Sequence, residues 1–370
     1  SLSFASTVTI NDDITTTGTQ TYAGAVIIGT DGVTLTTTNS QITFSSTVNS
    51  EASEANALNI SVGSSEVEFD GIIGGGTNGS LGAITITGAL DLDAALTSAT
   101  SLSVSTTSNL GANVTTSSTQ TYTGAVTLSG GDRTLTGSTV NFVSTLAGGT
   151  NALTVTGNLD LDDAATGLST LDVSGTSNLG ANVTTSSTQT YTGAVTLSGG
   201  DRTLTGSTVN FVSTLAGGTN ALTVTGNLDL DGAATGLTTL SVSGTSNLGA
   251  NVTTSSTQTY TGAVTLSGGD RTLTGSTVNF VSTLAGGTNA LTVTGNLDLD
   301  GAATGLSTLG VSGTSNLGAD VTTSSTQTYT GAVTLSGGDR TLTGSTVNFV
   351  STLAGGTNAL TVTGNLDLDG

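Results

Sequence analysis

Residues 360–370 read LTVTGNLDLDG, and the first ten letters of this stretch occur three times earlier, starting at Leu153, Leu222 and Leu291. Leucine and valine alternate with threonine and aspartate, and a single glycine interrupts the alternation. A period of two places apolar side chains on one face of a strand and polar side chains on the other. The stretch therefore predicts β-strand structure that is broken at the glycine.

The stretch belongs to a tandem repeat of 69 residues, because the four arginines and four of the five tyrosines recur at that spacing. These residues are Arg133, Arg202, Arg271 and Arg340, and Tyr122, Tyr191, Tyr260 and Tyr329. The nearly identical repeats occupy residues 108–176, 177–245 and 246–314, and a partial repeat occupies residues 315–370.

Residues 1–107 form a diverged first unit of the same kind. TQTYAGAV at 19–26 matches TQTYTGAV at 119–126, and ITITGALDLDAA at 84–95 matches the repeat sequence. Tyr22 precedes Tyr122 by 100 residues, so this unit holds 31 additional residues. We place this insertion at about residues 45–83. It contains all four glutamates of the chain, which are Glu51, Glu54, Glu66 and Glu68.

Within a repeat, short phrases such as TYTG, TLTG and TVTG end in glycines that are 13, 20, 18 and 18 residues apart. A coil of roughly 18–20 residues is typical of a β-helix. The alternative is a chain of β-sandwiches, but a sandwich needs about 100 residues and usually larger core aromatics. The sequence therefore predicts an all-β protein, a single continuous parallel β-solenoid with three to four coils in each 69-residue repeat. At ~4.8 Å per coil, one repeat would rise roughly 14–19 Å and the chain would form a rod on the order of 90 Å long.

The alternation also predicts which side chains face the interior. We expect the outward positions Thr127, Asn141, Thr154, Asp160 and Asp162 to face water. The expected inward positions are Tyr122, Val126, Leu128, Leu135, Val140, Phe142, Leu153, Val155, Leu159, Leu161, Leu171 and Val173. The long repeat would also separate equivalent aspartates by more than the ~8 Å screening length, so that they do not repel one another.

The composition restricts the possible partners. The chain has no Lys, His, Cys, Met, Trp or Pro, and its net charge is −21. Nucleic acid and anionic membrane surfaces are disfavoured as partners because binding them requires clustered Lys and Arg. No apolar run approaches the length of a membrane span. No signal peptide is evident and the chain starts at Ser1, so we expect a segment of a larger exported protein.

Catalysis is disfavoured by the same composition. Polysaccharide-cleaving β-helices use carboxylates that converge with Lys, Arg or His. In this chain each arginine follows an aspartate in a GGDR turn, so we expect a local Asp132–Arg133 pair rather than an active site. We predict that the protein is not an enzyme and holds no catalytic residues.

The DLD pairs are the candidate metal ligands, because two outward carboxylates two residues apart are compatible with Ca²⁺. The favoured interpretation is a solvated acidic face without a cofactor, because the glycine-rich nonapeptide of calcium-binding β-rolls does not occur. The candidate ligands are Asp160, Asp162, Asp229, Asp231, Asp298, Asp300, Asp367 and Asp369. Two further features are weaker: T-x-T phrases similar to ice-binding arrays, and sequons such as those at Asn113 and Asn251, replaced by Asp320 in the fourth repeat.

TQTYTGAVTLSGGDRTLTGSTVNF at 119–142 and NALTVTGNLDLDGAATGL at 220–237 resemble the repeat regions of filamentous-haemagglutinin-like bacterial surface proteins and autotransporter passengers. The resemblance covers residues from about 19 to 370. It implies a right-handed parallel β-helix, export across the outer membrane to the cell surface, and a role in adhesion, biofilm or surface fibres. It carries over no catalytic residue.

We therefore expect a non-enzymatic extracellular rod that serves as a stalk or filament and either self-associates or continues in a longer chain. The alternative is a specific adhesin module for carbohydrate or another cell, with residues 45–107 as the place to look because they depart from the repeat. A calcium-stabilised, surface-layer-like or ice-binding solenoid is the further alternative. We expect no insertion into a membrane.

Overall fold

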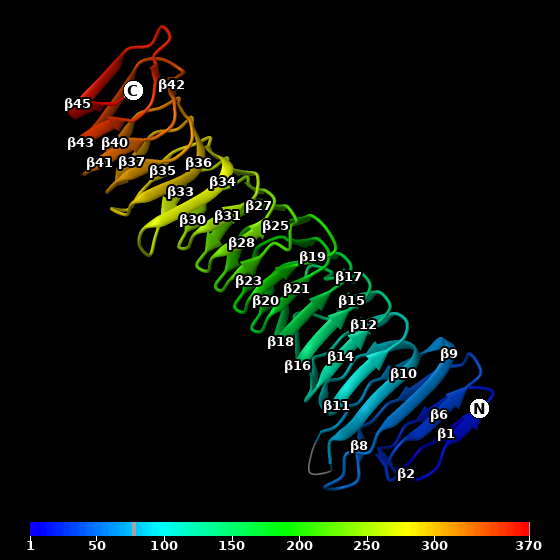
Figure 1. Ribbon diagram of the computed structural model, residues 1–370. Coiled ribbons are helices and arrows are strands. Elements are labelled where there is room, and N and C mark those ends of the chain that lie inside the picture. The colour runs from blue at the N-terminus through cyan, green and yellow to red at the C-terminus, as the bar shows by residue number, and fades with distance from the viewer. Residues whose placement is uncertain (76–78, 370) are drawn as a thin grey trace. The chain divides into compact units, whose positions relative to one another are not determined.

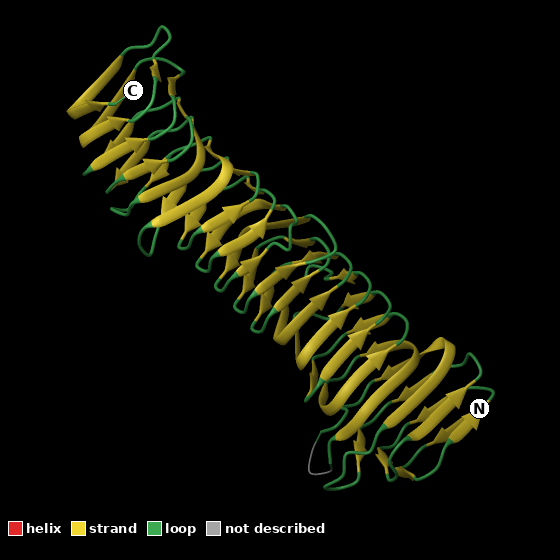
Figure 2. Ribbon diagram, in the orientation of Figure 1, coloured by secondary structure: helices red, strands yellow, loops and turns green. Residues whose placement is uncertain are grey.

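The computed structural model describes residues 1–75 and 79–369, and these consist of β-strands and turns without any helix (Figure 2). Residues 76–78 of the predicted insertion lie outside the described residues. The chain divides into two compact units, residues 1–186 and 187–370.

The described strands of the first unit are mostly three to five residues long, and five are longer. They are β1 (Leu2–Phe4), β2 (Val8–Ile10), β3 (Ile14–Thr16), β4 (Gln20–Tyr22), β5 (Val26–Ile28), β6 (Val33–Thr37), β7 (Ile42–Phe44), β8 (Val48–Ser50), β9 (Leu58–Phe69), β10 (Leu81–Leu92), β11 (Leu96–Val104), β12 (Ser108–Leu110), β13 (Val114–Thr116), β14 (Thr119–Tyr122), β15 (Val126–Leu128), β16 (Arg133–Phe142), β17 (Leu146–Ala147), β18 (Leu153–Leu161), β19 (Ala165–Leu168), β20 (Leu171–Val173), β21 (Ser177–Leu179) and β22 (Val183–Thr185).

The second unit repeats the pattern of β14 to β22. Its strands are β23 (Thr188–Tyr191), β24 (Val195–Leu197), β25 (Arg202–Phe211), β26 (Leu215–Ala216), β27 (Leu222–Leu230), β28 (Ala234–Leu237), β29 (Leu240–Val242), β30 (Ser246–Leu248), β31 (Val252–Thr254), β32 (Thr257–Tyr260), β33 (Val264–Leu266), β34 (Arg271–Phe280), β35 (Leu284–Ala285), β36 (Leu291–Leu299), β37 (Ala303–Leu306), β38 (Leu309–Val311), β39 (Ser315–Leu317), β40 (Val321–Thr323), β41 (Thr326–Tyr329), β42 (Val333–Leu335), β43 (Arg340–Phe349), β44 (Leu353–Ala354) and β45 (Leu360–Leu368).

Each unit is a parallel β-solenoid, because its strands pair in parallel with strands one coil away (Figure 1). In the repeats the offset between paired residues is 17 to 21 residues, as in Leu168↔Thr185 and Val114↔Leu135. Pairing between coils satisfies the backbone hydrogen bonds of all three sides. The predicted all-β parallel solenoid is confirmed, and the sandwich alternative is not observed.

Three inward-facing columns run through the second unit, and one tyrosine–phenylalanine stack lies in each. Tyr191 pairs with Phe211, Tyr260 with Phe280, and Tyr329 with Phe349. The registers place these three stacks in different columns. The column of Tyr191 continues through Leu230 and Leu248, whereas Val242 precedes Tyr260 and Val311 precedes Tyr329 in theirs. Consecutive repeats therefore place the same residues on different sides of the coil.

The repeat length causes this rotation. From β23 to β31 the chain forms eleven strand segments, because β25 and β27 each turn a corner and supply a segment to two sides. With three segments in each coil, one 69-residue repeat makes three and two-thirds coils, which lies within the predicted range of three to four. The corresponding rise is about 18 Å per repeat.

The diverged first unit has longer coils. Phe4, Tyr22, Phe44 and Phe69 form one stacked column, with ring centroids 4.8 to 5.5 Å apart, and Leu92 follows in register. The repeat has only two aromatic layers at the equivalent place, Tyr122 and Phe142, before Leu161. The additional residues of the first unit therefore form one further coil and lengthen its neighbours.

The inward positions predicted in the first repeat are all buried, from Tyr122 at 0% exposed to Leu159 at 3%. Of the predicted outward positions, Thr127 and Asp162 are exposed, and Asn141, Thr154 and Asp160 are partly exposed. The sequence did not indicate that Gln120 is fully buried beside Tyr122. The Gln120 Nε2 donates to the Thr136 carbonyl oxygen at 2.8 Å, and the Tyr122 hydroxyl donates to the Gln120 Oε1 at 3.1 Å.

The corner in β27 requires a glycine. Gly226 has a φ of +131°, and a Cβ at this position would lie 1.8 Å from the carbonyl oxygen of Gly206 in the preceding coil. The register between β25 and β27 shifts at this corner, between Thr205 and Thr208. Both the backbone conformation and the close approach exclude a side chain here.

We predict that Gly226→Ala destabilises the second unit by about 3 kcal/mol, because the coils on either side must separate. Gly310→Ala is the matched control, since Gly310 has open space around its Cβ position. We expect the control to leave stability within about 0.5 kcal/mol of the wild type. Hydrogen exchange of the flanking strands measures both variants, and equal protection in the two would contradict the prediction.

Candidate functional site

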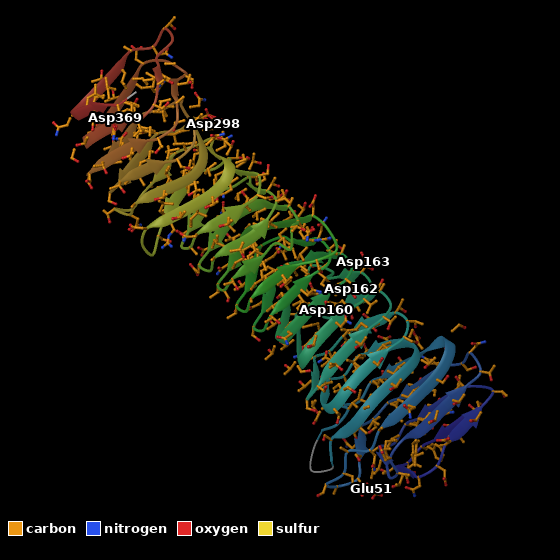
Figure 3. All side chains as sticks on the ribbon, in the orientation of Figure 1. Glu51, Asp160, Asp162, Asp163, Asp298 and Asp369 are labelled. Carbon is orange, nitrogen blue, oxygen red and sulfur yellow. The ribbon has the colours of Figure 1, made fainter. Side chains whose placement is uncertain are left out.

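The DLD pairs lie at the ends of β10, β18, β27, β36 and β45, and Figure 3 labels Asp160 and Asp162. The Asp160 Oδ1 accepts a hydrogen bond from the Asn178 Nδ2 at 2.8 Å, and Asn178 is in register with Asp160 one coil further. Burial raises the pKa of Asp162, and the charge of Asp160 raises it further. Asp160 is therefore part of a polar ladder, which is a structural role.

The same ladder occurs in the second unit, where Asn247 donates to Asp229 and Asn316 donates to Asp298, both at 2.8 Å. In both cases an asparagine also lies one coil earlier, Asn210 before Asp229 and Asn279 before Asp298. Asp229, Asp298 and Asp367 lie outside three different columns, those of Tyr191, Tyr260 and Tyr329. Equivalent acidic pairs in this unit are thus separated around the coil as well as along it.

Within residues 1–75 and 79–369, a third carboxylate approaches a DLD pair only in the diverged residues 1–107. Among the described residues, Glu68, Asp91 and Asp93 are the one group of at least three potential metal ligands within 4.8 Å of one another. Asp91 and Asp93 are the DLD pair of the diverged residues 1–107, and Glu68 lies beside Asp91 on the preceding coil. Three carboxylates are oxygen donors of the type that Ca²⁺ prefers, although Ca²⁺ takes six to eight oxygen ligands.

The sequence analysis did not select this cluster, because Glu68 becomes a neighbour of Asp91 only when the first unit's coils of 23 to 26 residues are in register. The Glu68 Oε2 accepts hydrogen bonds from the Gln41 Nε2 at 3.0 Å and from the Thr43 hydroxyl at 3.2 Å. Burial raises the pKa of Glu68, and nearby Asp70 and Asp91 raise it further; burial and Asp91 likewise raise the pKa of Asp93.

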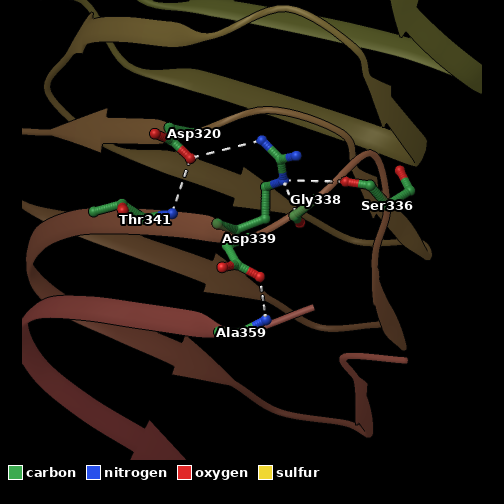
Figure 4. Close-up of polar contacts among 7 residues, drawn as sticks. Asp320, Ser336, Gly338, Asp339, Thr341 and Ala359 are labelled. Atoms are coloured by element: carbon green, nitrogen blue, oxygen red, sulfur yellow. Dashed lines mark hydrogen bonds and ion pairs between the residues drawn. The ribbon is translucent and has the colours of Figure 1, made fainter. Parts of the chain in front are cut away.

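The GGDR turns hold the solenoid together rather than forming a catalytic pair. The Asp132 Oδ1 accepts the backbone N–H of Ala152 in the next coil at 2.8 Å, and the Arg133 Nε donates to the Ser129 carbonyl oxygen at 3.0 Å. The predicted Asp132–Arg133 pair is wrong, because the carboxylate and the guanidinium each bind backbone groups instead. In the part of the chain that the structure describes, the one ion pair is Arg340 with Asp320, at 3.8 Å (Figure 4).

The sequon asparagines have a structural role of the same kind. The Asn113 Oδ1 accepts the backbone N–H of Thr134 at 2.9 Å, and Asn251 does the same for Thr272. Asp320 takes this place in the fourth repeat and accepts from Thr341 at 2.9 Å (Figure 4). An aspartate can replace the asparagine because only the side-chain oxygen is used.

The T-x-T phrases, the weaker ice-binding alternative, do not form an unbroken threonine column on the face of Thr259. In the second unit the outward residues Thr259, Asn279, Asp298, Asn316 and Thr334 follow one another in register. The amide and carboxylate side chains therefore interrupt the hydroxyl column within a few coils. A continuous flat hydroxyl face, which ice binding requires, is not formed along this column.

Shallow apolar hollows recur at the ATGL strands. One of about 180 Å³ is lined by Thr150, Gly167 and Leu168 and by Thr184–Ser186, and one of about 190 Å³ has the equivalent lining around Leu237. Thr150 has a φ of +73°, an unusual conformation for a β-branched residue, and its N–H donates to the Gly167 carbonyl oxygen at 2.7 Å. The hollows contain no titratable side chain.

In the part of the chain that the structure describes, no helix is long and apolar enough to cross a membrane. No family model, no curated protein and no solved structure shows significant similarity to this chain. The class that the fold defines is that of tandem-repeat parallel β-solenoids.

We predict that Glu68→Gln raises the melting temperature at pH 7, because it removes a charge that Asp70 and Asp91 repel. The folded-state pKa of Glu68 is raised, so the wild type regains this stability as the pH falls towards the ordinary value of 4.5. The advantage of the variant should therefore shrink as the pH is lowered. Asp172→Ser removes one exposed charge where the next repeat has Ser241, and this control should show no such pH dependence.

The same melting experiment tests calcium. A melting temperature that rises with added Ca²⁺ in the wild type but not in Glu68→Gln would assign the ion to the Glu68 cluster. A melting temperature that chelator does not change would remove calcium from the cluster and from the DLD pairs.

We predict that Asp270→Ala destabilises the second unit by about 1 kcal/mol, because the Asp270 Oδ1 accepts the backbone N–H of Ala290 at 2.8 Å. Asp270→Asn keeps an acceptor oxygen and should be close to the wild type, as the exchange of asparagine and aspartate at 251 and 320 indicates. Urea denaturation compares the two variants. Equal loss in both would mean that charge, rather than the hydrogen bond, stabilises the turn.

Proposed function

We propose that this chain is a non-enzymatic structural protein, a β-solenoid that serves as an extracellular stalk or fibre segment of a bacterial surface. The observation that carries the proposal is the repeat itself. Each repeat supplies the same core, the same capped turns and the same ladder, and stability in such a protein grows by stacking neighbouring coils. A repeat of this kind is suited to set a length.

Polar side chains of the repeats support the proposal, because their hydrogen bonds go to the protein's own backbone or to side chains of neighbouring coils. Asp132 and Asn113 cap turns, Gln120 binds the interior of its corner, and Asp160 belongs to a ladder. These groups are engaged in structure and are not arranged around a substrate. The resemblance of the repeat phrases to filamentous-haemagglutinin-like proteins adds the bacterial surface, adhesion and biofilm to the proposal.

Self-association or continuation in a longer chain is part of the same proposal. The strands of a solenoid leave unpaired backbone groups at each end of a stack, and unpaired strand edges readily pair with further strands. Leu366 and Leu368 on β45 are 49% and 59% exposed, whereas their equivalents Leu297 and Leu299, covered by a following coil, are 3% and 1% exposed. A further coil over β45 would bury them.

We predict that deletion of residues 177–245 removes one repeat without loss of fold and shortens the particle by about 18 Å in electron micrographs. The junction reproduces a natural repeat boundary, so the melting temperature should change little. Deletion of residues 177–246 is the matched control. It is one residue longer and places Asn247 where Ser177 is 2% exposed, so the melting temperature should fall.

An unchanged particle length, or equal melting of the two deletions, would overturn the proposal that the repeat is a length-setting module. Antibody labelling of intact and permeabilised cells tests the extracellular placement. Labelling that requires permeabilisation would contradict it.

A further inference from the structure

A hollow of about 390 Å³ lies on the outer face of the first unit, where the diverged coils meet the first repeat. Glu66 of β9 and Asp91 of β10 contribute carboxylates to it, and Asn109 of β12 and Thr127 follow Asp91 in register on the next two coils. Its volume is within the range of small-molecule sites in proteins. β9 and β10 lie side by side in Figure 1.

The lining of this hollow differs from the equivalent surface of the repeat. The sequence GALDLD of β10 matches GNLDLD of β18, so Ala89 takes the place of Asn158. The Asn158 Oδ1 accepts the backbone N–H of Thr176 at 2.9 Å and its hydroxyl at 3.0 Å. Asn227 and Asn296 cap Thr245 and Thr314 in the same way, at 2.9 Å. In the repeats the asparagine thus occupies the space that is hollow in the first unit.

Because alanine cannot make this hydrogen bond, the equivalent donor in the first unit is left open. Thr107 corresponds to Thr176, and its backbone N–H has no hydrogen-bond partner among residues 1–75 and 79–369. Thr107 and Ala89 both line the hollow. The hollow is therefore lined by a residue whose backbone N–H has no acceptor among the described residues.

The carboxylates of the hollow require a ligand that also donates hydrogen bonds. Glu66 is exposed and corresponds to Thr139 of the repeat, so its charge is specific to the diverged residues 1–107. Its Oε1 accepts from the Gln41 Nε2 at 3.2 Å, which holds the side chain over the face. Carboxylate oxygens accept from hydroxyl groups, whereas the paired charges of Glu66 and Asp91 repel anions.

We propose that this groove, defined by Glu66, Ala89, Asp91, Thr107, Asn109 and Thr127, binds a neutral saccharide. A sugar carries adjacent hydroxyl groups that both donate and accept, and so can serve the carboxylates and the Thr107 N–H together. Its C–H face fits the small apolar side chains of Ala89 and Ala125 in the lining. The proposal is independent of the structural function, because the repeats lack both the glutamate and the alanine.

The repeat itself provides the blocking variant, Ala89→Asn combined with Thr106→Gly. The glycine is needed because Gly175, the equivalent of Thr106, would place a Cβ 2.6 Å from the Asn158 Oδ1. The pair occurs in folded form in three repeats, so the variant should fold. Thr106→Gly alone is the matched control, which leaves the groove open.

Saturation-transfer difference NMR and calorimetry of the full chain use glucose, galactose, mannose, N-acetylglucosamine and N-acetylgalactosamine as probes. We expect at least one of them to bind the wild type and Thr106→Gly, and the double variant to bind at least about tenfold more weakly. Glu66→Gln keeps the shape of the groove but loses the charge-assisted hydrogen bond, so its affinity should fall about tenfold.

A second variant tests the site by addition. Thr139→Glu with Asn158→Ala reproduces the groove in the first repeat, so the calorimetric stoichiometry should rise from one saccharide per chain to two. Asn158→Ala alone lacks the carboxylate and should leave it at one. The proposal is overturned if no probe binds the wild type, if the double variant binds as the wild type does, or if the groove residues respond to Ca²⁺ instead of to any sugar.

Discussion

The register between consecutive coils is the constraint on which the structure depends. Parallel pairing fixes each inward column, so a tyrosine must lie on a valine and under a phenylalanine, as in Val104, Tyr122 and Phe142. The backbone groups are satisfied only in this register, since each strand has its partner one coil away. The turns then serve the register: the aspartate of each GGDR turn and the asparagine or aspartate after each SNLGA segment cap N–H groups that the pairing leaves open.

A repeat of eleven strand segments on a three-sided coil has consequences for the surface. Within the second unit, no side carries Asp229, Asp298 and Asp367 together, although these residues are identical in sequence context. In the column of Thr259, Asn279 and Asp298, hydroxyl, amide and carboxylate side chains follow one another. The rotation thus disperses the charged pairs over different columns. This outcome opposes both ice binding and a continuous line of metal sites.

The alternation of apolar and polar residues was sufficient to predict the fold class, the inward positions and the length of a coil. It could not predict the rotation of the repeats, because the spacing of the phrases does not reveal that β25 and β27 each supply two sides. Burial of Gln120 also escaped prediction, since glutamine is ordinarily an exposed residue. The acidic cluster of Glu68, Asp91 and Asp93 depends on a register across longer coils. Asp132 and Arg133 are adjacent in sequence, yet the backbone offers each a better partner.

The first unit shows how a solenoid can acquire a specific site without a change of fold. The repeat closes its surface by using one side chain, that of Asn158 and its equivalents, to cap the next coil. Replacement by Ala89 retains the strand, because the position faces outward and the core residues Leu90 and Leu92 are unchanged in character. The replacement leaves a backbone N–H of Thr107 without its acceptor, and Glu66 adds a carboxylate to the same hollow. A structural repeat thus becomes a candidate recognition surface through the loss of one cap, at the place where the sequence departs from its own period.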